Sequence, residues 1–132
     1  MTQEQKELLF KDLCARLPYG IKAEIKYYDG VYKLQAIYTD GTTYVTRDVG
    51  NPIETYFEDC KPYLIPLSSM TEEQSKELEE IDPEFYSLIC ENGDICVSMD
   101  VRGYDWLNKY HFDYRGLIRM GLAIDATNLN IY

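Results

Sequence analysis

The spacing of apolar residues at the start of the chain predicts a helix. Leucines recur every four residues from Leu9 to Leu17 and so share one helical face. Ahead of them, Thr2 and Gln5 have the form of a capping box, in which each side chain accepts a backbone amide of the other residue. A proline and a glycine follow within three residues of Leu17 and end the element. We therefore expect a helix over residues 1–18.

Two dipeptides, Asp29-Gly30 and Asp40-Gly41, predict where the strands that follow reverse direction. A type I′ turn needs φ > 0 at both central residues, which glycine adopts freely and aspartate at small cost. A two-residue turn at Asp29-Gly30 places alternate side chains on a common inner face. The facing pairs on that face are Tyr27 with Tyr32, Ile25 with Leu34, Ala23 with Ala36 and Ile21 with Tyr38. The turn at Asp40-Gly41 continues this face into a third strand.

A further strand between Ile53 and Tyr63 would lengthen the series. Pro62 and Pro66 lack the amide that a central ladder position needs, so we expect them to stay out of a central strand. Residues 20–66 are thus predicted to form an antiparallel β-meander or a small open barrel of the SH3-like or OB-like kind.

Beyond the meander the pattern becomes helical again. Thr71 and Gln74 form a second capping box, and few apolar positions follow, so we predict a solvent-facing acidic helix over residues 71–82. The dipeptide Asn92-Gly93, flanked by alternating apolar residues, predicts a β-hairpin over residues 85–100.

The last third of the chain predicts two short helices. Asp105 and Asp113 are suited to cap them, and Gly121 is suited to end the second one in a left-handed conformation. We place this helical pair over residues 105–121. Together these elements predict an α+β fold in a single domain over residues 1–132, a common length for one hydrophobic core.

Negative charge is concentrated in the middle of the chain. The formal net charge is −10, and residues 71–100 contribute −9 of it through ten acidic side chains and one lysine. This balance argues against a protein that neutralises nucleic-acid phosphates. It favours either a solvated acidic surface or attraction to a basic partner.

The four cysteines and the single histidine argue against a metal centre. The cysteines show no C-x-x-C spacing, and one histidine leaves few soft ligands for zinc. We expect no cofactor, no metal, and reduced thiols packed as small apolar groups. The chain has no apolar segment behind a basic start and no stretch long enough to cross a bilayer, which predicts a cytoplasmic protein without a membrane partner.

One cluster near the end of the chain holds a base, an acid and a cation: His111, Asp113, Tyr114 and Arg115. A catalytic histidine needs an orienting partner on one ring nitrogen, which Asp113 could supply, and a nucleophile or substrate on the other. Free amides beside Arg115 would suit a carboxylate or phosphate, unless Asp113 caps those amides itself. This cluster defines an alternative function, a small-ligand or anion-binding domain or a minor enzyme.

The outer face of the first hairpin gathers Lys22, Lys26 and Lys33 with Tyr28 and Tyr44. Basic grooves with aromatic platforms bind single-stranded nucleic acid, which makes this a second alternative. The chain has 13 tyrosines, a residue favoured both in strands and in interface anchors. The acidic remainder of the chain counts against direct nucleic-acid binding.

Three blocks of the chain form a distinctive set. They are EQKELLFKDLCARLPYG (residues 4–20), KPYLIPLSSMTEEQ (61–74) and WLNKYHFDYRGLIRMGLAIDATNLNIY (106–132). Together they resemble an uncharacterised family of small proteins encoded by gut bacteria and by their phages or other mobile elements. The resemblance implies cytosolic residence and an accessory or host-interaction role, and it brings no activity, cofactor or catalytic residue.

These observations favour a non-enzymatic protein that binds another protein, with an anti-defence role for a mobile element as the more specific hypothesis. The partner would be basic, for example a protein that handles nucleic acid. No catalytic residue is predicted. The residues predicted to bind the partner are Tyr28, Tyr44, Glu72, Glu73, Glu77, Glu79 and Glu80.

Overall fold

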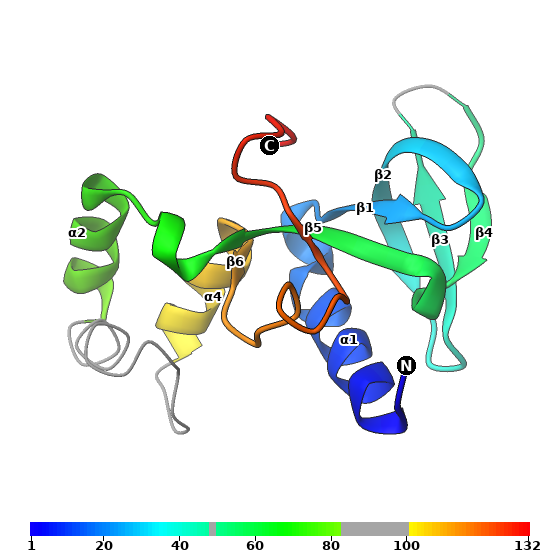
Figure 1. The fold of residues 1–132 in the computed structure, drawn as a ribbon, viewed down its shortest axis with the longest axis horizontal. Helices are drawn as coiled ribbons and strands as arrows, with labels where there is room; N and C mark the ends of the chain where they lie inside the picture. Colours follow the sequence, from blue (N-terminus) through cyan, green and yellow to red (C-terminus); the bar gives the residue numbers. More distant parts are fainter. Residues whose placement is uncertain (48–49, 83–100) are drawn as a thin grey trace.

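The computed structural model describes residues 1–47, 50–82 and 101–132 (Figure 1). These residues form an N-terminal helix, a mixed sheet of seven strands and further helices, which is the α+β fold that the sequence predicts. Among the described residues, no helix combines the length and the apolar composition that crossing a membrane requires.

The N-terminal helix is confirmed. Helix α1 (Gln3–Arg16) begins at the predicted capping box, where Thr2 Oγ1 accepts the amide of Gln5 and the Gln5 side chain accepts the amide of Thr2. A short 3₁₀ turn (Leu17–Tyr19) follows, and Gly20 closes it with φ = 72°. The left-handed conformation of Gly20 ends the helix and turns the chain into the sheet.

The described strands form one sheet in the order β4-β3-β2-β1-β5-β6, with β7 also paired to β5. The first four strands are antiparallel neighbours, which confirms the predicted meander. Strand β5 is antiparallel to β1 and parallel to β6 and β7. The strands are β1 (Lys22–Ile25), β2 (Tyr28–Ile37), β3 (Thr42–Thr46), β4 (Ile53–Tyr56), β5 (Cys60–Pro66), β6 (Phe112–Asp113) and β7 (Ile124–Asp125).

The first predicted turn is wrong in its position. The chain reverses at Lys26-Tyr27, where Tyr27 itself has φ = 73°, and Gly30 lies inside β2 with φ = 104°. The observed pairs are Ala23 with Tyr32 and Ile25 with Tyr28. Because the register shifts between these pairs, Gly30 belongs to a bulge rather than to a turn. Tyr27, predicted to point inward, is 87% exposed.

This slip nevertheless keeps Ile25, Tyr32 and Leu34 on the inner face of the meander. Ala23 pairs with Tyr32 instead of Ala36, a displacement of four positions along β2. Side chains on a strand alternate with a period of two, so an even displacement keeps each side chain on its face. Ile25 and Leu34 are accordingly both buried, as predicted.

The second predicted reversal is confirmed in place but not in register. Gly41 donates its amide to Tyr38 O (2.9 Å) across the turn and has φ = 95°. A two-residue turn at Asp40-Gly41 would pair Tyr38 with Thr43, but Ile37 pairs with Thr43 instead. The Tyr38 amide donates to Thr42 O (2.8 Å), so the loop holds the three residues 39–41. Tyr38 is therefore exposed and not part of the inner face.

Pro62 lies inside a central strand, which corrects the prediction that it would not. Strand β5 pairs Pro62 with Ala23 of β1. The Lys26 amide donates to Asp59 O (2.9 Å), so these two residues form a hydrogen-bonded pair. Hydrogen-bonded and non-hydrogen-bonded pairs alternate along an antiparallel ladder, and Pro62 with Ala23, three positions away, is a non-hydrogen-bonded pair. The ladder with β1 therefore needs no amide from residue 62. Pro66 is the last residue of β5.

The predicted acidic helix is confirmed as α2 (Glu72–Ile81), which begins at the Thr71-Gln74 capping box. Helix α4 (Val101–Lys109) begins before Asp105, so Asp105 lies within the helix and is not its cap. The hairpin predicted over residues 85–100 lies outside the described residues.

The second helix of the predicted C-terminal pair does not form. Phe112 and Asp113 are extended as β6, and residues 114–121 form bends and turns. The parallel pairing of Phe112 with Ile65 holds the chain extended where a helix would have to begin. Gly121 has the predicted positive φ (75°), but it follows a turn instead of a helix.

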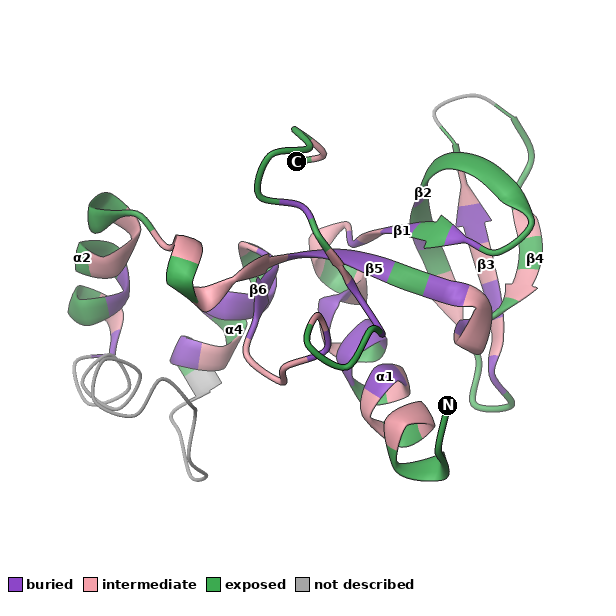
Figure 2. Ribbon diagram, viewed as in Figure 1, coloured by how far each residue is buried: buried purple, intermediate pink, exposed green. Residues whose placement is uncertain are grey.

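In the described part of the chain, the buried apolar residues form two clusters. Figure 2 shows the buried residues in purple. The larger cluster joins α1 to the meander and includes Leu13 and Leu64. The smaller cluster joins α2 to α4 and includes Leu78 and Leu107, with Ile65 packed against it. Strand β5 runs across the molecule from the meander to the helices and contributes a residue to each cluster (Figure 1).

Candidate functional site

The candidate catalytic histidine is enclosed by the protein. His111 is 7% exposed, and its ring stacks on the ring of Tyr132 with centroids 3.7 Å apart. Burial, followed by the charges of Arg16 and Lys22, lowers the pKa of His111 to about 4. Its Nδ1 atom is buried without a hydrogen-bond partner. The imidazole is therefore neutral at pH 7 and is not oriented by Asp113.

The carboxylate of Asp113 caps the turn that follows it. One oxygen accepts the amide of Leu117 (2.9 Å) and the other accepts the amide of Ile118 (3.0 Å). Both amides that an anionic ligand could use are thus occupied by the protein's own side chain. The structure favours the structural interpretation of Asp113 over the anion-binding one.

Tyr114 and Arg115 face a different set of partners from His111. Arg115 Nη1 donates to Asp12 Oδ1 (3.0 Å) and to the hydroxyl of Tyr114 (2.7 Å), and the Tyr114 hydroxyl donates to Asn108 Oδ1 (2.8 Å). A hollow of about 390 Å³ opens beside them, lined in part by Tyr104 and Asn108. The four clustered residues are thus divided between a closed interior position and an open hollow.

The sequence reasoning missed a buried ion pair that supports this region. Asp12 and Arg16 are both fully buried, and Arg16 Nε donates to Asp12 Oδ2 (2.8 Å). A second guanidinium nitrogen of Arg16 donates to Phe112 O (2.6 Å) and so joins α1 to β6. The i, i+4 spacing of Asp12 and Arg16 was visible in the sequence, but the third partner, Arg115, is 103 residues away from Asp12.

The two described cysteines are poor nucleophiles. Cys60 is buried, and desolvation together with the charge of Asp59 raises its pKa to about 12. Cys14 is classed as exposed, but the partial burial of its thiol also raises its pKa. A thiol with a raised pKa carries little of the reactive thiolate at pH 7. Neither residue is therefore prepared to react with a substrate.

The predicted binding residues of the acidic helix are all exposed. Glu77 differs from the others because its Oε1 accepts the indole nitrogen of Trp106 (3.1 Å) and the hydroxyl of Tyr110 (3.3 Å). These bonds hold α2 against α4 and use Glu77 structurally. The remaining carboxylates, which are exposed and form no ion pair in the described part of the chain, belong to Glu72, Glu73, Glu79 and Glu80.

The predicted lysine and tyrosine face is not one surface. Tyr28 and Tyr44 lie near opposite ends of β2, because Tyr28 begins that strand and Tyr44 pairs with Ala36. Eight residues of strand separate these ends by roughly 26 Å. Tyr28 packs edge-on against Tyr32, and Tyr44 packs edge-on against Tyr38. The negative charge of Glu54 is the main cause that raises the pKa of Tyr44.

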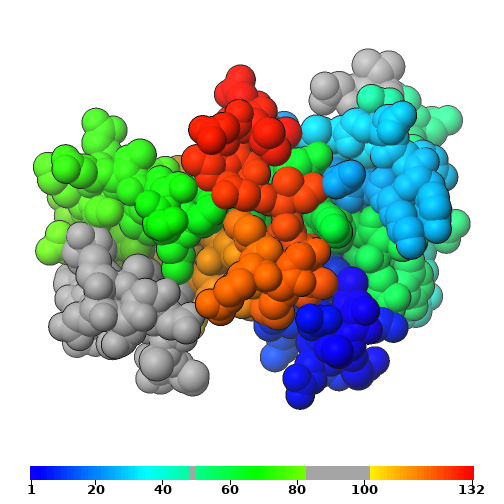
Figure 3. Space-filling model, viewed as in Figure 1, coloured from blue at the N-terminus to red at the C-terminus, as the bar shows by residue number. Residues whose placement is uncertain are grey.

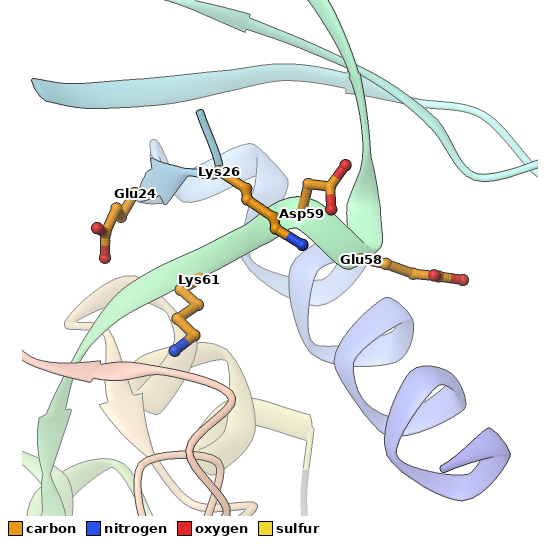
Figure 4. Close-up of a pocket in the computed structure, with 5 residues that line it drawn as sticks. All are labelled: Glu24, Lys26, Glu58, Asp59 and Lys61. Carbon is orange, nitrogen blue, oxygen red and sulfur yellow. The ribbon is translucent and has the colours of Figure 1, made fainter. Parts of the chain in front are cut away.

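Lys26 does not lie on this face of the hairpin. It lies in the turn after β1 and reaches across β5 toward Asp59 and Glu58, in a cavity of about 370 Å³ (Figure 4). Glu24 and Lys61 also line this cavity, which therefore holds three acidic and two basic side chains. A cavity with nearly balanced charges has no strong preference for an ion of either sign.

Comparison with known proteins assigns no relative: no protein-family model, no curated protein and no solved structure matches this chain.

Proposed function

We propose that the protein is a non-enzymatic binding protein that engages a basic partner protein through the acidic face of α2. The observation that carries this proposal is the group of exposed carboxylates at Glu72, Glu73, Glu79 and Glu80, none of which forms an ion pair within the described chain. These carboxylates present a local negative field to solvent, which would attract a basic surface of a partner.

Exposed tyrosines provide a second contact surface. Tyr27, Tyr28, Tyr38 and Tyr56 are each at least 42% exposed, and all lie on the meander. Helix α2 and the meander stand at opposite ends of the long axis of the molecule (Figure 1). A partner that used both surfaces would have to span that axis, so we treat the two contacts as separable.

The enclosed imidazole and the capped Asp113 give no support to an enzyme at residues 111–115. An acidic helix instead suits competition with nucleic acid for the basic surface of a nucleic-acid-handling protein, because both present closely spaced negative charges. This fits the host-interaction role implied by the resemblance to proteins of phages and mobile elements, with a defence nuclease as the specific hypothesis.

The experiment compares two variants of equal net charge in quantitative capture from the host lysate. The test variant carries Glu72→Gln, Glu73→Gln, Glu79→Gln and Glu80→Gln, and it keeps the structural Glu77. The control variant neutralises four exposed acids elsewhere, namely Glu4, Glu24, Asp29 and Glu54.

We expect basic proteins captured by the wild type at low salt to be lost with the test variant and retained with the control, because the attraction depends on the local field of α2. Equal capture by the wild type and the test variant would refute the role of α2. A tyrosine variant with Tyr27→Ser and Tyr28→Ser then tests the second surface separately.

A further inference from the structure

Two lysines face each other directly across the first two strands. The register pairs Lys22 of β1 with Lys33 of β2. Like charges in directly opposite positions of an antiparallel pair destabilise the sheet. Neither ammonium group forms an ion pair within the described part of the chain. The free protein therefore holds two cations together without an anion from these residues to neutralise them.

A third cation is positioned beside this pair. The guanidinium of Arg47, just beyond β3, lies over the ring of Tyr32 with 5.3 Å between Cζ and the ring centroid. It also packs against Gly30, where an added Cβ would lie only 2.5 Å from Arg47 Nη2. The absence of a side chain at Gly30 thus leaves the space that Arg47 occupies. Arg47 has no ion-pair partner among the described residues either.

The C-terminal segment completes the site. Lys22 Nζ donates to Ile131 O (3.0 Å), and the hydroxyl of Tyr132 accepts the amide of Lys22 (2.9 Å) and donates to Tyr63 O (2.8 Å). These bonds fasten the end of the chain to β1 and β5. In the space-filling view this segment, drawn in red, stands beside the meander (Figure 3).

The three cations surround a hollow of about 270 Å³ that Thr46 and Asn130 also line. The lining side chains in the described part of the chain include no carboxylate. The neighbouring cavity in Figure 4 differs, because it combines Lys26 and Lys61 with three acids. Of these two sites, the hollow lined by Lys22, Lys33 and Arg47 has cations without acids, although the chain has a net charge of −10.

We propose that this hollow, formed by Lys22, Lys33 and Arg47, binds the dianionic phosphate group of a small phosphate monoester or free phosphate. Arg47 supplies a planar fork of donors that matches phosphate oxygens, and the two lysines supply point charges. A phosphate monoester carries close to two negative charges at pH 7, which offsets most of the charge of the three cations. The volume suits a phosphate with a small organic group.

The test is a titration of the full chain followed by amide NMR and by calorimetry. The probes are ribose 5-phosphate, inorganic phosphate, ribose and a short single-stranded oligonucleotide. We expect ribose 5-phosphate to shift the amides of Lys22, Lys33 and Arg47, and ribose to shift none. A similar response to inorganic phosphate would support a site for free phosphate, and a weaker one would support a site for the ester.

Variants separate a built site from general attraction. We expect Lys33→Gln and Arg47→Gln each to weaken phosphate binding about tenfold, because each removes charge-assisted hydrogen bonds. Lys61→Gln, which removes a cation from the other cavity, should bind like the wild type. Lys33→Gln should also keep or raise the melting temperature, because it relieves the repulsion with Lys22.

Three results would overturn the proposal. The first is the absence of any shift with either phosphate at millimolar concentration. The second is equal weakening by Lys61→Gln and Lys33→Gln, which would indicate nonspecific attraction. The third is binding of the oligonucleotide without binding of the monoester, which would assign the hollow to a phosphodiester backbone. None of these outcomes bears on capture by α2, so this inference and the proposed function fail independently.

Discussion

The imidazole of His111 lies flat against the phenol ring of Tyr132, with centroids 3.7 Å apart and planes inclined by 14°. The stack joins the turn before β6 to the end of the chain, and it encloses the only histidine of the protein. Burial makes the charged form of this imidazole unfavourable in the folded state.

We predict that stability falls in acid between about pH 6.5 and pH 4. The pKa of His111 is lowered from 6.5 in the unfolded chain to about 4 in the folded protein, so the unfolded state binds more protons in this window. The contribution of His111 to the free energy of unfolding is therefore fully present above pH 6.5. It is lost as the pH falls, by about 3 kcal/mol in total. Urea denaturation at several pH values measures the decline.

A single imidazole signal in the proton NMR spectrum gives the same pKa directly. In His111→Asn, which tolerates the φ of 64° at this position, the slope contributed by His111 should vanish and leave only the slope of the carboxylates. A measured midpoint near 6.5 in the folded protein would contradict the closed position of the ring.

The sequence predicted which side chains of the meander face inward better than it predicted the position and register of the turns. Gly41 lies in a turn as predicted, whereas Gly30, in the same Asp-Gly context, lies in a bulge. Both structures require φ > 0 at glycine, so the local signal is the same for each. Each glycine is also packed against a side chain that is distant in the sequence, Arg47 at Gly30 and Tyr56 at Gly41. Such a contact has no counterpart in the local pattern.

The candidate cluster at residues 111–115 shows the same limit. Residues adjacent in sequence were expected to act together, but the extended chain at Phe112 and Asp113 sends neighbouring side chains to different sides. His111 thus stacks on Tyr132, while Arg115 reaches Asp12 of the first helix. The two capping boxes, in contrast, were predicted correctly because each joins residues only three positions apart.

Replacing Gly30 tests how the bulge holds Arg47. We predict that Gly30→Ala lowers the free energy of unfolding by about 1–3 kcal/mol, because alanine is strained at φ = 104°. It should also displace Arg47 and weaken phosphate binding. Gly50→Ala is the matched control, since Gly50 has φ = 123° with no heavy atom within 4 Å of the added Cβ. Equal phosphate affinity in both variants would show that Gly30 does not position Arg47 for phosphate binding.

The hydroxyl of Tyr132 is predicted to stabilise the fold through its bonds to Lys22 and Tyr63. Tyr132→Phe retains the stack on His111 but leaves the Lys22 amide and the Tyr63 carbonyl without this partner. We expect a loss of about 1–2 kcal/mol in the free energy of unfolding. Tyr27→Phe, at a ring that is 87% exposed, should change it by less than about 0.5 kcal/mol. Chemical denaturation of both variants gives the comparison, and equal values would show that the C-terminal bonds contribute nothing.

The buried pair of Asp12 and Arg16 is predicted to be the most sensitive polar contact in the described structure. Asp12→Asn removes the charge that Arg16 needs in a fully buried position and weakens the bond to Arg115. Breaking one partner of a buried ion pair leaves the other uncompensated, so we expect a loss of about 3–5 kcal/mol. Lys6→Gln breaks the partly exposed bridge to Glu58 (3.4 Å) and should cost less than about 1 kcal/mol.

Thermal and urea unfolding of these two variants measure both losses under the same conditions. If Asp12→Asn does not fold, Arg115→Gln provides the milder measurement, because it removes the exposed end of the same network and leaves the pair between α1 residues intact. It should cost less than Asp12→Asn and more than Lys6→Gln, since its side chain is 22% exposed and its partner is fully buried. An order in which Lys6→Gln is the most damaging would contradict the assignment of this network as the anchor between α1 and the C-terminal part of the chain.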